Sequence, residues 1–259
     1  QSGIVNYTHE YLYGFQIGVV NIAQRVLGWQ IGVINAAEDA YLPMMGVFVN
    51  WTAQEAYGGQ MSIGFNQARR TLFQVSGILN NVRHRSYLQI TGGLNFSGYA
   101  HIQLAGLFND SVRSLFQVAG LLNTARYIKL FQLSGIYNLA KNAPLQISLG
   151  GNKIDTWAIQ LAPIINISDK SGVQFSGIVN YAHSSPFQFS AVSNFNESAA
   201  VQLAGLFNYS GLSILQSGFL NISAISQVQL GAINYAYHLY KLQLGIVNSS
   251  HTSKGVSIG

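Results

Sequence analysis

The sequence has little of what a soluble globular protein needs to cover its surface. It contains no cysteine, only 4 prolines and 8% charged residues, whereas ordinary soluble proteins have about 25% charged residues. The absence of cysteine excludes disulfides, thiolate zinc sites and cysteine nucleophiles. The low charge indicates apolar surroundings or a polymer that stacks on itself.

Long hydrophobic runs are also missing. No stretch of 18 apolar residues occurs, so the sequence encodes no transmembrane helix. The net charge is a modest +5, and the basic residues are scattered singly or in pairs such as Arg69 and Arg70. We therefore expect no nucleic-acid partner. No signal peptide is visible and the chain begins inside a repeat, so we expect a processed piece of a longer precursor.

A repeat covers nearly the whole chain. The unit is Gln-φ-small-Gly-φ-φ-Asn, where φ is apolar, and its terminal asparagine recurs 18 times from Asn6 to Asn248. The spacing is 13 to 16 residues and usually 14. Degenerate copies include Met44–Asn50, and the clean copies are Gln74–Asn80, Gln103–Asn109, Gln117–Asn123, Gln132–Asn138, Gln174–Asn180 and Gln202–Asn208.

Charge is excluded from a fixed part of each repeat. Of the 21 charged residues, 19 lie three to seven places after a repeat asparagine, and none lies between a repeat Gln and its Asn. The uncharged segment, about ten residues long, alternates apolar residues with Gln, Ala or Ser, and Asn, and this period is typical of a strand. Its length is that of a transmembrane strand, and aromatic residues near its ends, such as Phe73 and Tyr181, are typical of a lipid-facing girdle.

These features predict an all-β fold over a single domain, 1–259: a transmembrane antiparallel up-and-down β-barrel of about 18 strands, one strand per 14-residue repeat. In it, large residues would face small ones across neighbouring strands. The alternative is a β-solenoid with 14-residue coils, in which identical units stack in parallel and form Gln and Asn ladders. The last four positions of each unit weigh against the solenoid, because they hold little apolar material to turn inward.

The Gln and Asn rows are the only polar feature at the expected membrane depth. They are predicted either to bond to one another and to the backbone or to line a neutral lumen. The residues expected on the lumen wall are Gln74, Asn80, Gln103, Asn109, Gln117, Asn123, Gln132, Asn138, Gln174, Asn180, Gln202 and Asn208.

The strings QIGVVNIA at Gln16–Ala23 and QIGVINAA at Gln30–Ala37 resemble the repeats of bacterial outer-surface proteins of spirochaetes and Bacteroidota, which carry tandem QxGxxN units. The resemblance extends over nearly all 18 units. It implies the outer surface of a diderm bacterium and implies no activity. The same string is also similar to curli-type repeats, although curli repeats are longer and lack this chain's apolar face.

No constellation of catalytic or metal-binding residues is visible. Glu38 and Asp39 are expected in a solvated loop, and there is no Walker loop, nucleotide-binding glycine fingerprint or nucleophile elbow. We therefore expect no enzyme, no cofactor and no metal. The histidines are all expected in solvated turns: His9, His84, His101, His183, His238 and His251.

The predicted barrel points to a pore in the cell outer membrane of a Gram-negative (diderm) bacterium, or to the membrane shell of a larger complex. The expected partners are outer-membrane lipid and other protein subunits, one of which would fill the lumen. The alternative function is that of a secreted or surface β-solenoid adhesin or fibre protein.

Overall fold

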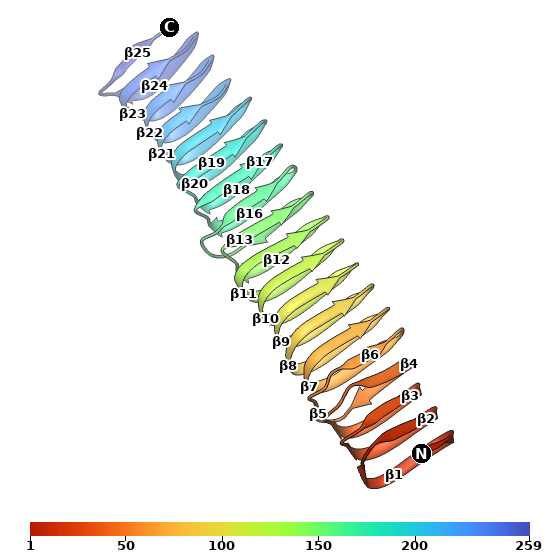
Figure 1. Cartoon of the computed structure of the whole chain (residues 1–259). Helices are drawn as coiled ribbons and strands as arrows, with labels where there is room; N and C mark the ends of the chain where they lie inside the picture. Colours follow the sequence, from red (N-terminus) through yellow and green to blue (C-terminus); the bar gives the residue numbers. More distant parts are fainter. The chain divides into compact units, whose positions relative to one another are not determined.

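The fold is all-β, and the computed structural model describes residues 1–259. The chain forms two compact units, Gln1–Lys129 and Leu130–Gly259, whose boundary falls inside one strand, β11. Each unit is a parallel β-solenoid, and the chain makes about 18 turns in all. Figure 1 shows the strands of each unit stacked one upon the next. No helix that could cross a membrane is present.

The strands have the following bounds. In the first unit they are β1 (Ser2–Leu12), β2 (Phe15–Val26), β3 (Trp29–Ala40), β4 (Met44–Thr52), β5 (Glu55–Ala56), β6 (Gln60–Ser62), β7 (Phe65–Ser76), β8 (Leu79–Thr91), β9 (Leu94–Ala105) and β10 (Phe108–Ala119), followed by β11 (Leu122–Ser134). In the second unit they are β12 (Tyr137–Asn142), β13 (Leu145–Ser148), β14 (Gly151–Ile154), β15 (Ile159–Ala162), β16 (Ile165–Lys170), β17 (Val173–Ser176), β18 (Val179–Ser184), β19 (Phe187–Ser190), β20 (Ser193–Ala204), β21 (Phe207–Ser217), β22 (Leu220–Leu230), β23 (Ile233–Leu244), β24 (Val247–Ser253) and β25 (Val256–Ile258).

One coil corresponds to one sequence repeat. In the coil that starts at β13, the Gln-bearing strand is followed by a tight turn at Leu149–Gly150 and then by the Asn-bearing strand β14. The turn at residues 155–158 carries the chain to β15, which lies directly against β13. The 14-residue period is therefore the length of one turn of the solenoid.

Most residues of the repeat stack on their equivalents in the next coil, apart from register shifts at bulges such as the one between Val82 and Arg85. Gln146 pairs with Gln160, and Asn152 pairs with Asn166, in parallel register. This arrangement suits identical units, because each amide meets an identical amide one strand spacing away.

The interior of the coils is polar and small, and the large apolar side chains point outward. Gln146, Ser148 and Asn152 are buried, whereas their neighbour Leu149 is exposed. Along the rest of each unit the buried positions are again held mainly by Gln, Asn, Ser and Ala. The predicted alternation along the strand is thus present, and the polar face points inward, where it packs inside the coil instead of lining a lumen.

The predicted antiparallel barrel is wrong, and with it the transmembrane β strands and the porin-like character that it implied. All strand pairings are parallel, as in the alternative solenoid. The argument against the solenoid failed because the coil needs no apolar material at its last positions. Small residues such as Ala143, Ser171 and Ser185 turn inward there and are fully or almost fully buried. The predicted facing of large and small residues is also wrong, because each position faces itself.

Candidate functional surface

The glutamine side chains form a hydrogen-bonded ladder inside each unit. In the second unit, Gln160 Nε2 donates to Gln146 Oε1 at 3.1 Å, and Gln174 Nε2 donates to Gln160 Oε1 at 2.8 Å. Each Nε2 also donates to a main-chain carbonyl, as Gln146 does to Lys153 O at 3.2 Å. Both amide hydrogens are therefore used within the protein.

The asparagine ladder runs beside it with the opposite polarity. Asn152 Nδ2 donates to Asn166 Oδ1 at 3.0 Å, toward the following coil, whereas the glutamines donate toward the preceding coil. Asn152 Nδ2 also donates to Leu161 O at 2.8 Å and Gln146 O at 3.3 Å. Buried amides satisfied in this way stabilise the coil stack, because a buried polar group costs free energy only when it lacks a partner.

The residues expected to line a lumen are the members of these two ladders. Without a barrel there is no lumen, and their side chains lie inside the coils and are fully buried. The structure brings them together in two rows within each unit and leaves none of them facing solvent: Gln74, Asn80, Gln103, Asn109, Gln117, Asn123, Gln132, Asn138, Gln174, Asn180, Gln202 and Asn208.

The glutamine ladder has one internal defect, at Met44 in the first unit. Met44 pairs in register with Gln30 on one side and Gln60 on the other, and it is fully buried. Gln30 Oε1 consequently has no hydrogen-bond partner. Gln60 Nε2 turns instead to Thr52 Oγ1 at 2.9 Å. Met44–Asn50 is one of the degenerate repeats of the sequence, and Met44 stands where the repeat has glutamine.

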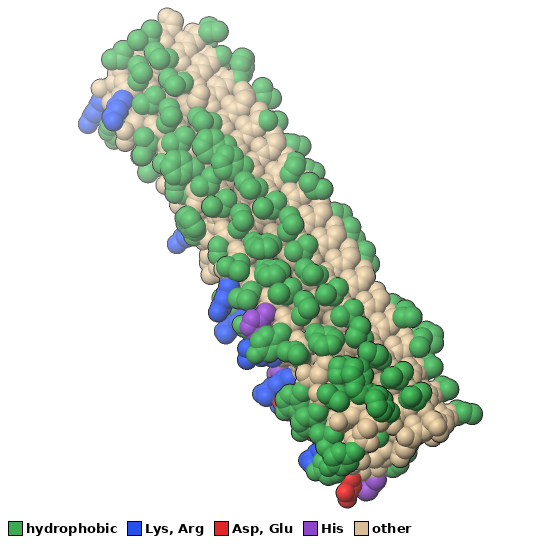
Figure 2. Space-filling view, in the orientation of Figure 1, with side chains coloured by type: hydrophobic (Ala, Val, Ile, Leu, Met, Phe, Trp, Pro, Cys, Tyr) green, Lys and Arg blue, Asp and Glu red, His purple; other side chains and the backbone are tan.

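The outer faces carry columns of large apolar side chains. Phe175 and Phe189 stack with ring centroids 4.8 Å apart, and Phe175 is 43% exposed. On the other strand of the coil, Tyr181 is 53% exposed. Figure 2 shows hydrophobic side chains spread over the visible face, with Lys and Arg confined to one edge of each unit. In this view the surface is largely apolar, and its cationic side chains gather along one edge.

In the first unit the neighbouring strands β7, β8, β9 and β10 bring arginine and tyrosine into one register. Arg70 pairs with Arg85, Arg85 with Tyr99, and Tyr99 with Arg113. The Arg113 guanidinium also lies 5.6 Å from the centre of the Tyr127 ring. We call these five residues the Arg–Tyr column. The column was not predicted from the sequence because its members lie 14 or 15 residues apart, although the repeat period was the signal that could have aligned them.

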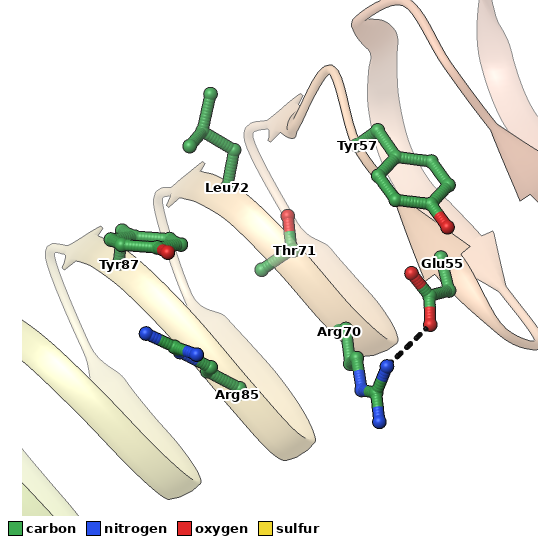
Figure 3. A pocket seen from close by; sticks show the side chains of 7 residues that line it. All are labelled: Glu55, Tyr57, Arg70, Thr71, Leu72, Arg85 and Tyr87. Atoms are coloured by element: carbon green, nitrogen blue, oxygen red, sulfur yellow. Dashed lines mark hydrogen bonds and ion pairs between the residues drawn. The ribbon is translucent and has the colours of Figure 1, made fainter.

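A notch opens beside the start of this column (Figure 3). Its volume is about 330 Å³. An ion pair of 3.0 Å joins Arg70 to Glu55 at one side of it. Its lining residues are Glu55, Tyr57, Arg70, Thr71, Leu72, Arg85 and Tyr87.

The two sides of the notch differ in charge: the carboxylate of Glu55 is paired, whereas the guanidinium of Arg85 is not. A hydrogen bond with the Glu55 side chain raises the pKa of Tyr57, and the negative charge of Glu55 acts in the same direction. Glu55 is therefore engaged by both Tyr57 and Arg70. The Arg85 guanidinium has no carboxylate partner and lies over two rings, 4.9 Å from Tyr87 and 5.4 Å from Tyr99.

The histidines do not assemble into a metal site. His101 is half-buried and stacks on Tyr87 with ring centroids 4.5 Å apart. His183 lies 2.9 Å from a carboxylate oxygen of Glu197, and both side chains are exposed. His251 stacks on Tyr237. No three His, Asp or Glu residues lie close enough to hold a metal ion.

No family model, curated protein or solved structure matches the chain. The function must therefore be argued from the surface of the two units. Because the interior amides are bonded to one another, the groups able to meet a partner are the apolar columns and the exposed charged side chains.

Proposed function

We propose that the chain is a secreted or surface β-solenoid adhesin or fibre protein of a diderm bacterium, and that it has no enzymatic activity. The observation that carries this proposal is the inverted distribution of side chains. Amides occupy the interior in hydrogen-bonded ladders, while Phe, Tyr, Leu and Ile point outward in columns.

The apolar columns favour an interaction role over a catalytic one. Soluble monomers rarely expose a contiguous apolar patch larger than a few hundred Å², and larger patches mark contacts with proteins or membranes. In the second unit, Phe175, Tyr181 and Leu206 are each 43% to 57% exposed. Other large apolar side chains occupy the equivalent positions of neighbouring coils. Such columns suit other protein subunits or outer-membrane lipid as partners.

The resemblance of the QxGxxN units to bacterial outer-surface repeat proteins supports the proposed location. A parallel coil stack also suits a surface role, because its stability adds up from neighbouring coils and needs no large apolar core. Cofactor and metal chemistry have no part in this proposal.

The test removes one stacked pair from the outer face. The double variant Phe175→Ser, Phe189→Ser should adhere to alkyl-coated beads at least about tenfold more weakly than the wild type. The reason is that burying an aromatic side chain contributes about 1.5–3 kcal/mol, and about 1.4 kcal/mol corresponds to a factor of ten. Sedimentation velocity would measure self-association of the same samples.

The matched control is Lys170→Ser, which changes an exposed residue at the end of β16. It should leave adherence and self-association unchanged. Circular dichroism and thermal melting should be alike for all three proteins, because the Phe rings lie outside the coils. A wild-type chain that stays a monodisperse monomer and adheres no better than the double variant would overturn the proposal.

A further inference from the structure

We propose that the notch between Tyr57 and Tyr87 binds an acidic sugar residue, and that the Arg–Tyr column binds the rest of an acidic polysaccharide chain. The inference rests on the proposed adhesin function only in that it places the chain where it can meet such glycans. Its evidence is independent of the apolar columns and lies wholly within the first unit.

The two walls of the notch are rings held in place from behind. Tyr57 stacks on Tyr41 with centroids 5.0 Å apart, and Tyr87 stacks on His101 at 4.5 Å. Both partners lie on the sides away from the notch, since register places Leu72 in the coil between Tyr57 and Tyr87. A ligand would therefore meet two pre-ordered ring faces and lose little of its binding free energy to ordering them.

The width of the notch favours a sugar over a nucleotide base. Tyr57 and Tyr87 are two coils apart, which corresponds to about 9.5 Å at a strand spacing of ~4.7–4.8 Å. A planar base between two rings needs only about 7 Å, since bases stack about 3.4 Å apart. A puckered sugar ring with hydrogens on both faces is thicker. Thr71 and Leu72 line the notch between the two tyrosines, and the Leu72 side chain is 49% exposed.

The charge of the notch favours an anionic ligand. Glu55 is neutralised by Arg70, so the cation left without a carboxylate is Arg85. Guanidinium presents several N–H donors in a plane that matches a carboxylate or sulfate group. The stacking on Tyr87 and Tyr99 holds this group at the rim of the notch, beside the ring of Tyr87 (Figure 3).

The continuation of the site favours a polymer over a single small anion. Arg85, Tyr99, Arg113 and Tyr127 alternate cation and ring over four coils, so the cations recur about every 9.5 Å. Between Asn66 and Lys129 the sequence has seven cationic residues and one carboxylate, Asp110. Asp110 accepts a short hydrogen bond of 2.5 Å from Thr124. A linear chain with regularly spaced acidic groups fits this surface.

The binding experiment uses the full chain and defined probes. Polygalacturonate and dextran sulfate supply carboxylate and sulfate groups, neutral dextran tests whether charge is needed, and oligo-dT tests nucleic acid. We expect saturable binding of at least one acidic glycan, little binding of neutral dextran, and weaker binding of oligo-dT. Equal or tighter binding of oligo-dT, or no binding of either acidic glycan, would overturn the inference.

Variants then locate the site. Arg85→Gln and Tyr87→Ala should each weaken glycan binding at least about tenfold, because a charge-assisted hydrogen bond and a stacking face are lost. Arg85→Lys should restore part of the affinity. Lys241→Gln removes the same charge from an exposed position of β23 in the second unit and should change binding less than about twofold.

The outcomes separate this inference from the proposed function. Equal losses in Arg85→Gln and Lys241→Gln would show diffuse attraction and refute the site. The Phe175→Ser, Phe189→Ser variant should bind glycan like the wild type, so loss of bead adherence and loss of glycan binding report on different claims. Circular dichroism and melting of each variant confirm that the coils are intact, since Arg85 and Tyr87 are exposed.

Discussion

At the scale of single residues, Met44 is the place where the repeat and the fold disagree. The side chain lies between Gln30 and Gln60 and leaves Gln30 Oε1 buried without a donor. Met44→Gln should raise the free energy of unfolding by about 1–2 kcal/mol, because an orphaned buried acceptor costs about 1–3 kcal/mol. Urea denaturation measures the change. Met44→Leu is the control and should bring no gain, and equal stability of the two variants would contradict the ladder account.

The effect of Glu55 on the pKa of Tyr57 can be tested by a single substitution. The hydrogen bond with Glu55 raises the pKa of Tyr57 above its ordinary value of 10.0. In Glu55→Gln the pKa should fall toward 10.0, because the carboxylate that opposes ionisation is gone. NMR titration of labelled tyrosine, assigned with Tyr57→Phe, measures the shift.

The same Glu55→Gln variant releases Arg70 from its ion pair. If the notch binds an acidic glycan, the additional free cation should tighten binding several-fold at neutral pH. Affinity for polygalacturonate that stays the same or falls would count against the role given to Arg70 and Arg85. An unchanged pKa of Tyr57 would show instead that the Glu55 hydrogen bond is absent in solution.

At the scale of the strands, the asparagine ladder should not tolerate a charge. Asn180 Nδ2 donates to Asn194 Oδ1 and Phe189 O, and the residue is fully buried. Asn180→Asp replaces these donors by a carboxyl group, and we expect a loss of about 2–5 kcal/mol at pH 7. Burial raises the pKa of the introduced carboxyl above its unfolded value of about 4.

Because the pKa of the introduced carboxyl is raised in the folded state, the free energy of unfolding of Asn180→Asp should decrease as the pH rises. The folded state holds the proton more tightly, so the stability of Asn180→Asp is greatest below about pH 4 and falls as the pH rises toward the raised pKa. Chemical denaturation between pH 3 and 8, relative to the wild type, measures it. Asn180→Ala should be destabilised without this added pH dependence. A flat difference for Asn180→Asp would mean that the side chain is hydrated.

The strands also show how far the sequence could lead. Period-two alternation and the 14-residue repeat correctly indicated strands. The expected confinement of charge to the turns is wrong, because charged residues such as Arg70, Arg85 and Lys153 lie within strands. The alternation and the repeat could not say whether the polar face lines an open lumen or packs inside a narrow coil, because alternation at Leu145, Gln146, Ile147 and Ser148 is the same in both folds. The usual preference for apolar interiors led to the barrel. In parallel register, however, each buried amide forms a hydrogen bond with the identical amide of the next coil, so a polar interior is stable.

The candidate surface was harder to predict than the fold. The Gln and Asn rows were recognised as paired amides or lumen wall, and their mutual bonding needed only the parallel register. The notch needed more: Tyr57, Leu72 and Tyr87 become neighbours only when 15-residue offsets replace the usual 14. A repeat of 15 residues can be recognised in the sequence. Which residues it stacks on one another depends on where the extra residue is accommodated, and the sequence does not show that position.

At the scale of the whole molecule, a solenoid holds together through neighbouring coils, so damage should stay local. Asn180→Asp at pH 7 should speed amide hydrogen exchange at least about tenfold in β16, β18 and β20, which pair through Asn166, Asn180 and Asn194. Exchange in β2 and β3 of the first unit should stay at the wild-type rate. Mass spectrometry of peptic fragments measures both regions in one sample. If all fragments accelerate equally, the chain unfolds as one cooperative body, and the additive coil account fails even though each ladder is intact.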